Sequence, residues 1–170
     1  MKRKSEPHDL LVALLLVQSL LERHSEAYFQ PFGLTGAQFN ILNLLSYNGG
    51  KMDQATLGDL LLVGKSSISI VLNRMVRDDL IKREEHPKDR RQVVLILTPK
   101  GLALWRKISP RYEASVKKIF GALPVSRRQR FLDDLKVLHD AFLAEAGDPE
   151  SASRWHSLFS TSTVFHPPKL

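Results

Sequence analysis

The chain has 170 residues, enough for one domain or for one domain with an additional arm. Lys and Arg outnumber Asp and Glu by 25 to 18, which gives a formal net charge of +7 and favours a polyanionic partner. The chain contains no cysteine, so disulfides, thiolate metal sites and cysteine-based redox switches are excluded.

The N-terminal part is dominated by an apolar run. The pattern predicts a helix from Asp9 to about Gln30, stopped by Pro31. Residues 10–17 are apolar around the whole helix circumference, so we expect residues 9–31 to form a dimerisation helix buried by a second subunit. The basic residues 2–4 and this apolar run together resemble a signal peptide, but Gln18 and Ser19 interrupt the apolar core and the helical pattern continues beyond them. The run is also shorter than the about 20 residues that a membrane span needs. We therefore expect a cytoplasmic protein with no membrane association.

A DNA-binding domain is predicted over residues 34–98. Thr35 and Gln38 form a capping box at the start of a helix that ends at residues 48–50, Asn-Gly-Gly. Asp53 is expected to cap a short helix, and Gly64 supplies the turn before the next one. This arrangement is typical of a helix-turn-helix pair.

The second helix of the pair has two faces. Its apolar positions recur at helical spacing and predict a buried stripe of Ile68, Val71, Leu72, Met75 and Val76. The opposite face carries Ser66, Ser67, Ile70, Asn73, Arg74 and Arg77. Short hydroxyls and free N–H groups at a helix start can approach DNA phosphates, and arginines can reach guanine edges. An ordinary solvated face is the alternative interpretation.

A hairpin follows directly. Residues 81–85 and 92–97 are predicted as strands, and the segment between them, 86–91, is a turn with a basic tip. Such a hairpin after a polar helix is the wing of a winged helix-turn-helix domain. A long arginine side chain at its tip suits the negative potential of a DNA minor groove.

These residues carry a family resemblance. The runs 87–91 (Pro-Lys-Asp-Arg-Arg), 97–101 (Leu-Thr-Pro-Lys-Gly) and 63–69 (Val-Gly-Lys-Ser-Ser-Ile-Ser) resemble the MarR family of transcriptional regulators. The resemblance implies a mainly α fold with a small β-hairpin wing, in which a winged helix-turn-helix DNA-binding domain joins a helical dimerisation region. It also implies that Asp89 orients Arg91, which enters the minor groove. Ile70 and Leu62 depart from the usual pattern, and Ile70 could touch a thymine methyl group instead.

The predicted function is a sequence-specific transcriptional regulator. We expect a homodimeric repressor that binds double-stranded DNA at a pseudo-palindromic operator. The predicted DNA-binding residues are Lys65, Ser66, Ser67, Ser69, Asn73, Arg74, Arg77, Lys88, Asp89, Arg90 and Arg91.

The resemblance also implies an effector. Many members bind small aromatic or phenolic anions between the DNA-binding and dimerisation parts. The candidate ligand-binding residues are His24, Tyr28, Phe32, Phe39 and Trp105. The alternative is that these aromatic residues belong to the core and that His24 is a plain helix residue.

The C-terminal part is predicted to be helical and then irregular. Residues 99–147 should form the C-terminal dimerisation helices. The first is capped by Thr98 and kinked or split by Pro110, and the second is capped by Ser126 with Gln129. Residues 148–170 are a Ser/Thr-rich tail. This tail is either disordered or docked on the partner subunit through Trp155, Leu158 and Phe159.

No catalytic or metal-binding motif is present in the sequence. It has no nucleophile elbow, no zinc-protease motif and no histidine pair at i, i+4, so we expect no enzyme activity, no cofactor and no metal. Residues 58–66 resemble a phosphate-binding loop only superficially, because five residues separate the glycines and four of them are apolar. Two alternatives stay open: a winged helix that binds protein, and a DNA-binding regulator without a ligand.

Overall fold

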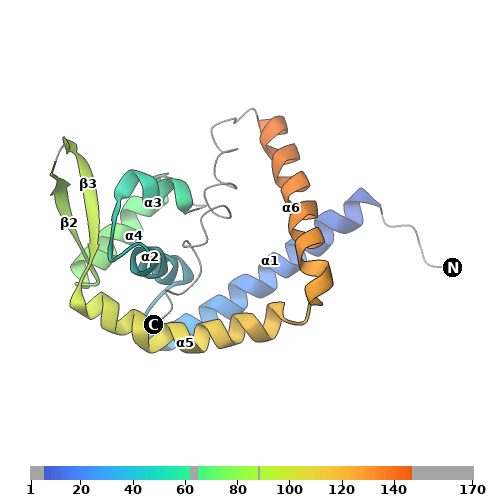
Figure 1. Ribbon diagram of the computed structural model, residues 1–170, viewed down its shortest axis with the longest axis horizontal. Helices are drawn as coiled ribbons and strands as arrows, with labels where there is room; N and C mark the ends of the chain where they lie inside the picture. The colour runs from blue at the N-terminus through green and yellow to red at the C-terminus, as the bar shows by residue number, and fades with distance from the viewer. Residues whose placement is uncertain (1–5, 62–64, 88, 147–170) are drawn as a thin grey trace. The chain divides into compact units, whose positions relative to one another are not determined.

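The computed structural model describes residues 6–61, 65–87 and 89–146 (Figure 1). The chain falls into two compact units, Met1–Asn40 and Ile41–Leu170. The predictions for Leu62, Gly64, Lys88 and the 148–170 tail lie outside the described residues. The side chains of Lys65, Ser66, Ser67, Arg90 and Arg91 also lie outside them, although their backbone is described.

The N-terminal unit contains the long helix α1 (Pro7–Phe29) and the short 3-10 helix η1 (Gln30–Phe32). α1 starts two residues earlier than predicted, because Pro7 occupies the first turn and the Glu6 N–H donates to the Asp9 carboxylate at 3.0 Å. The predicted end at Pro31 is confirmed, since α1 ends at Phe29 and Pro31 lies in η1.

The apolar run of α1 is exposed within the single chain. The leucine and valine side chains of residues 10–17 keep between 36% (Leu14) and 61% (Leu16) of their surface. A contiguous apolar surface of this kind is rare on a monomeric protein. In the described part of the chain, no helix is long and apolar enough to cross a membrane.

Helix α2 (Gly36–Tyr47) has the predicted capping box. The Thr35 N–H donates to Gln38 Oε1 at 2.8 Å, and the Gln38 N–H donates to Thr35 Oγ1 at 3.2 Å. The helix stops as predicted, because Gly49 (φ 71°) and Gly50 (φ 84°) adopt left-handed backbone conformations that glycine tolerates.

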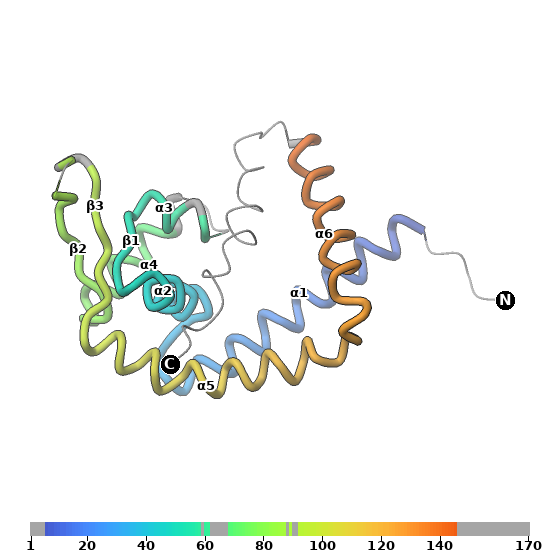
Figure 2. Tube along the Cα trace, viewed as in Figure 1, coloured from blue at the N-terminus to red at the C-terminus, as the bar shows by residue number. Residues whose placement is uncertain are grey.

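A three-stranded antiparallel sheet joins β1 (Lys51–Asp53), β2 (Ile81–His86) and β3 (Asp89–Leu97) in the order β1-β3-β2 (Figure 2). The sequence did not predict β1, because three residues are too few to show strand alternation. The hairpin turn is shorter than predicted. Asp89 already pairs with His86, so Arg90 and Arg91 belong to β3 and not to the turn.

The helix-turn-helix pair consists of α3 (Gln54–Leu60) and α4 (Lys65–Arg77). Asp53 occupies the predicted N-cap of α3, but among the described residues its side chain accepts no capping hydrogen bond. The predicted buried stripe of α4 is too wide: Ile68, Leu72 and Met75 are buried, while Val76 is 36% exposed. At about 100° per residue, Val76 lies roughly 80° round the helix from Ile68, at the edge of the buried arc.

The sheet leads into α5 (Pro99–Phe120) and α6 (Val125–Ala146). The sequence predicted that Pro110 would kink or split α5. Pro110 removes one backbone donor, but α5 continues through it, so the predicted split is wrong. α6 begins one residue before the predicted Ser126 cap, because the Arg127 N–H donates to the Pro124 carbonyl. Gln129 consequently bonds Asp133 one turn further along instead of capping the helix.

The core of the C-terminal unit is built from α2, α3, α4, the sheet and the first half of α5. Its most buried side chains are Ile41, Leu42, Leu44, Leu45, Leu57, Leu72, Met75, Ile81, Leu95 and Ile108. This core holds α4 by its inner face and leaves its outer face in solvent.

Candidate nucleic-acid interface

The outer face of α4 is polar and positively charged. Asn73, Arg74 and Arg77 are exposed, as is Ser69, and all of them were predicted to contact DNA. Ile70 lies among them with 74% of its surface exposed. Because Ile68, Leu72 and Met75 anchor the opposite side, the described part of this outer face, from Ser69 to Arg77, is available to a partner.

A hydrogen bond joins this face to the wing. Arg83 Nη1 on β2 donates to Asn73 Oδ1 on α4 at 2.6 Å, and both side chains are exposed. Sequence analysis missed Arg83 as a site residue. Strand alternation would have placed it on the same side of β2 as the buried Ile81, which is the side that packs near α4.

Charges along the wing are partly paired with each other. Lys82 and Glu84 form an exposed ion pair on β2, and Gln92 Nε2 donates to Asp89 Oδ2 at 3.2 Å. The predicted orientation of Arg91 by Asp89 concerns a side chain outside the described ones. Exposed pairs of this kind contribute little stability.

The base of the wing is fixed by the Leu97–Gly101 segment. The Thr98 hydroxyl accepts from the Gly101 N–H at 3.0 Å and donates to the carbonyls of Leu80 (3.0 Å) or Asp79 (2.7 Å). A Cβ on Gly101 would lie 2.1 Å from the Leu80 carbonyl oxygen, so only glycine fits there. The segment therefore ties the start of α5 to the chain between α4 and β2.

Polar contacts also tie α5 to α2. Trp105 Nε1 donates to Asn43 Oδ1 at 2.9 Å, and the Trp105 ring meets the Tyr47 ring edge-on at 5.9 Å. The Tyr47 hydroxyl donates to Glu113 Oε1 at 3.4 Å. Burial, followed by the charge of Glu113, raises the pKa of Tyr47 to about 12. These contacts favour the structural interpretation of Trp105.

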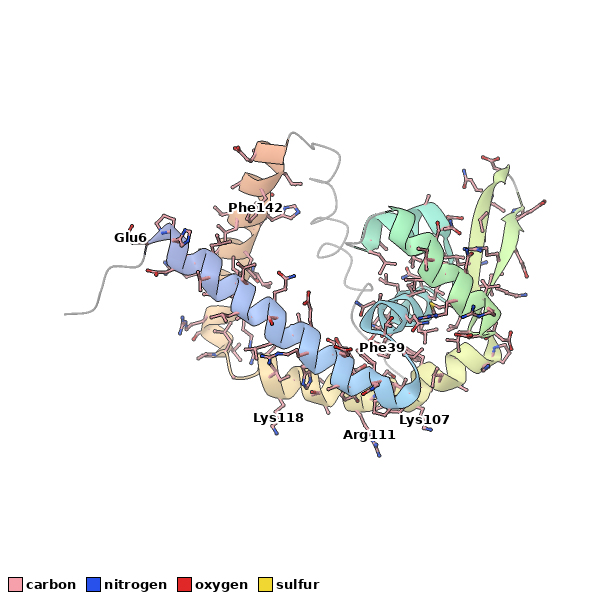
Figure 3. The ribbon with its side chains drawn as sticks, turned by 180° about the vertical axis from the view of Figure 1, so that it is seen from behind. Glu6, Phe39, Lys107, Arg111, Lys118 and Phe142 are labelled. Atoms are coloured by element: carbon pink, nitrogen blue, oxygen red, sulfur yellow. The ribbon has the colours of Figure 1, made fainter. Side chains whose placement is uncertain are left out.

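The other candidate ligand residues lie in the N-terminal unit. Phe39 (labelled in Figure 3) is fully buried and stacks on Phe29 at 4.5 Å, which favours the core interpretation for this residue. Tyr28 lies between His24 (6.3 Å) and Phe32 (6.4 Å), measured between ring centroids. His24 is exposed and the other two rings are half-buried, so these three remain accessible.

Positive charge is not confined to α4 and the wing. Lys107, Arg111 and Lys118 are exposed and project from the same side of α5 (Figure 3). The net charge of the chain therefore does not by itself locate a DNA-binding surface.

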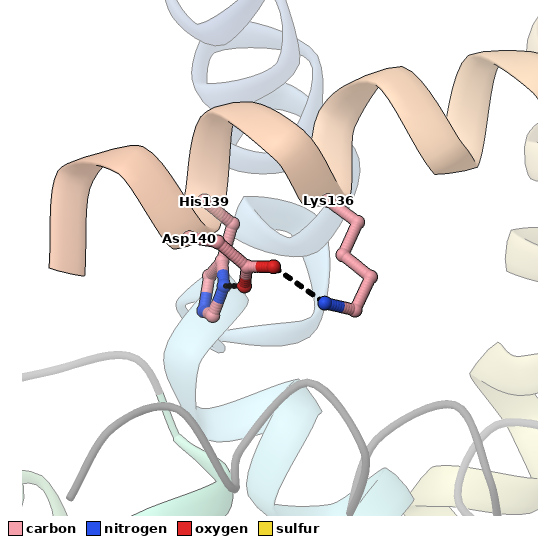
Figure 4. A network of polar contacts seen from close by, with 3 residues as sticks. All are labelled: Lys136, His139 and Asp140. Carbon is pink, nitrogen blue, oxygen red and sulfur yellow. Dashed lines mark hydrogen bonds and ion pairs between the residues drawn. The ribbon is translucent and has the colours of Figure 1, made fainter. Parts of the chain in front are cut away.

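Helix α6 carries a small exposed cluster of charged side chains that pair with one another. Lys136 and His139 both contact Asp140, and the hydrogen bond from Lys136 is the larger cause of the lowered pKa of this carboxyl group (Figure 4). Among the described residues, no three His, Asp or Glu side chains gather to hold a metal ion.

A helix-turn-helix pair followed by an anchored hairpin defines a winged helix-turn-helix protein. Comparison with known proteins agrees. The MarR family model matches residues 32–92. The regulator MhqR of Bacillus subtilis is 27% identical over 114 residues, which cover 67% of this chain and 78% of MhqR. The homoprotocatechuate degradative operon repressor of Escherichia coli is 27% identical over 128 residues, which cover 72% and 83% of the two chains.

Solved structures show the same fold. The MarR family regulator AbsC from Streptomyces coelicolor has a TM-score of 0.74 and 29% identity, covering 84% of this chain and 99% of AbsC. A protein assigned to the MarR family from Listeria monocytogenes, complexed with a 26mer DNA, has a TM-score of 0.69 and 20% identity, with coverages of 84% and 92%. The organohalide-sensing regulator RdhR in its 2,4-dichlorophenol-bound form has a TM-score of 0.70 and 19% identity, with coverages of 84% and 89%.

The family model, the relatives and the solved structures support the assignment of this chain to the MarR family. The predictions of the family and of the winged helix-turn-helix fold are thereby confirmed. Members of this family are transcriptional regulators and not enzymes, as the sequence predicted for this chain.

Proposed function

We propose that this protein is a homodimeric transcriptional repressor that binds a pseudo-palindromic operator. The observation that carries the proposal is the outer face of α4, which is exposed, polar and basic and is hydrogen-bonded to the wing that follows it. A structural neighbour from Listeria was solved with DNA, and the E. coli relative is a repressor.

In the proposed complex, α4 enters the major groove. Asn73 and Arg74 contact bases or phosphate, Ser69 lies near the helix start, and Arg77 holds phosphate. From the family resemblance, Arg91 enters the minor groove with Asp89 orienting it. The remaining contacts are assigned on the same basis to Lys65, Ser66, Ser67, Lys88 and Arg90.

The proposed dimer buries the apolar surface of residues 9–31 together with residues 99–147. The exposed leucines of α1 support this assignment, as do Phe131 (49% exposed) and Phe142 (64%) on α6. A symmetric dimer would place two copies of α4 in successive major grooves, about 34 Å apart.

We further propose that a small aromatic or phenolic ligand releases the DNA. RdhR was solved with 2,4-dichlorophenol, and the accessible rings of His24, Tyr28 and Phe32 offer aromatic contacts on this chain. Ligand binding would favour a spacing of the two α4 helices that no longer matches the operator.

The direct experiment is a mobility shift with the DNA upstream of the protein's own gene, repeated across salt concentrations. We expect a dimer-sized complex that random DNA does not displace, with log affinity falling linearly in log salt. Arg74→Ala and Arg91→Ala should each weaken binding and reduce the salt slope by about one if they contact phosphate. Arg111→Ala removes the same charge from α5 and serves as the matched control.

The rival functions give different results. A winged helix that binds protein would show only weak DNA binding, which random DNA abolishes. A ligand-independent regulator would bind the operator, but titration with aromatic acids and phenols would not release it. Arg91→Ala with the affinity of the wild-type protein would refute the assignment of the wing.

A further inference from the structure

The hydrogen bond between Arg83 and Asn73 constrains how the predicted DNA-reading helix can read a base. Arg83 Nη1 lies 2.6 Å from Asn73 Oδ1. A guanidinium group has only donors, so the atom of Asn73 that faces it must be the carbonyl oxygen of the amide. The donor is also charged, which makes this bond shorter and stronger than one between neutral groups.

Because Arg83 occupies Oδ1, the Asn73 side chain can offer a DNA base only the hydrogen-bond donors of its Nδ2 group. An asparagine that selects adenine presents its oxygen to N6–H and its amide nitrogen to N7, side by side. With Oδ1 turned toward β2, Asn73 cannot present both atoms to one base. Its Nδ2 group remains, and this group can only donate.

Base edges differ in what they accept. In the major groove guanine offers two acceptors, N7 and O6, and thymine offers O4. Adenine offers one acceptor, N7, beside a donor, N6–H2, and cytosine offers only a donor. We propose that Arg83 is a specificity-determining residue: it fixes Asn73 as a donor, so that the pair loses the bidentate contact that selects adenine and favours guanine or thymine. The inference rests on the proposed DNA binding and deepens it.

The geometry of the wing supports a positioning role for Arg83. Arg83 lies on the same side of β2 as the buried Ile81, which is anchored in the core next to α4. Its neighbour Lys82 points to the other face of the strand and pairs there with Glu84. Lys82→Ala therefore removes one positive charge from the same strand without touching Asn73.

The test is selection from random DNA with the full-length protein, followed by affinity measurements in which each operator base pair is replaced in turn. Asn73→Ala identifies the base pair that Asn73 reads, as the position where the preference of the wild-type protein disappears. We expect guanine or thymine on the contacted strand at that position. Arg83→Ala should shift the preference there toward adenine by about tenfold, the size of one good bidentate contact.

Further variants separate positioning from charge. Arg83→Met keeps the aliphatic length of the side chain and should produce the same shift as Arg83→Ala. In an Asn73→Ala background, Arg83→Ala should change no base preference. Lys82→Ala should weaken binding equally for all sequences, because it affects only non-specific attraction.

The failures are distinguishable. If the wild-type protein shows no sequence preference at all, the proposed function fails. If it binds specifically and Arg83→Ala keeps the same base preferences, the inference is overturned, even when the affinity falls uniformly. Such a uniform loss would mean that Arg83 only contacts phosphate. A wild-type preference for adenine at the Asn73 position would overturn the inference as well.

Discussion

Replacing Thr98 by valine tests whether the base of the wing depends on a single hydroxyl group. Valine keeps the shape and β-branching of threonine, and the extended backbone at this residue (φ −78°, ψ 164°) suits both. The change removes the acceptor for the Gly101 N–H and the donor to the Leu80 or Asp79 carbonyl. In the valine variant the Leu80 carbonyl still accepts a hydrogen bond from the backbone N–H of residue 98, which lies 3.2 Å away in the wild-type protein.

The magnitude follows from these contacts. Loss of an N-cap costs about 1 kcal/mol, and loss of the donated bond adds about 0.5–1.5 kcal/mol. Because the Gly101 N–H is left without its acceptor in a buried position, we expect a total of about 2–3 kcal/mol in the free energy of unfolding. For a chain of this size that corresponds to a drop in Tm of about 5–10 °C.

The assay is urea denaturation at one fixed chain concentration, because the stability of the proposed dimer depends on concentration. Thr98→Ser is the matched control, since it keeps the hydroxyl and loses one methyl group, at a cost of about 0.8 kcal/mol. Thr98→Val should be the less stable of the two variants. If it is as stable as Thr98→Ser or the wild-type protein, the hydroxyl does not hold this junction and the reasoning is wrong.

Three further predictions concern single positions. Gly101→Ala should lower the free energy of unfolding by about 2–3 kcal/mol in the same assay, because its Cβ would lie 2.1 Å from a backbone carbonyl; unchanged stability would refute the close approach. The pKa of Tyr47 rises from 10.0 to about 12 on folding, so the folded state favours the protonated hydroxyl. The resulting contribution to the free energy of unfolding should be complete below pH 10 and should be lost between pH 10 and 12. Tyr47→Phe should lack this loss when unfolding is compared at about pH 9 and about pH 11.5. Leu16→Glu should convert the proposed dimer to a folded monomer in analytical ultracentrifugation; a dimer that persists would show that α1 is not the interface.

Local signals determined much of the fold. The capping box of Thr35 and Gln38 and the cap of Thr98 involve atoms three residues apart, so the sequence alone contains both partners. The glycines at 49 and 50 end α2 through their own backbone freedom. The family resemblance rested on such short segments, and it correctly indicated the winged helix-turn-helix fold.

Other features were decided only by the tertiary structure. β1 exists because residues 51–53 pair with residues 94–96, more than 40 positions away. Val76 is exposed because the core covers a narrower arc of α4 than the apolar spacing suggests. In the same way, the need for glycine at position 101 comes from the carbonyl of Leu80.

The candidate site shows the same division. Its α4 residues follow from helical periodicity, so the sequence by itself identified Asn73, Arg74 and Arg77 as outward-facing. It could not identify Arg83 as the partner of Asn73, because that contact requires β2 to pack beside α4 at a particular depth and register. Periodicity determines which side of an element a residue occupies, whereas the packing of elements far apart in sequence determines which side chains meet across them.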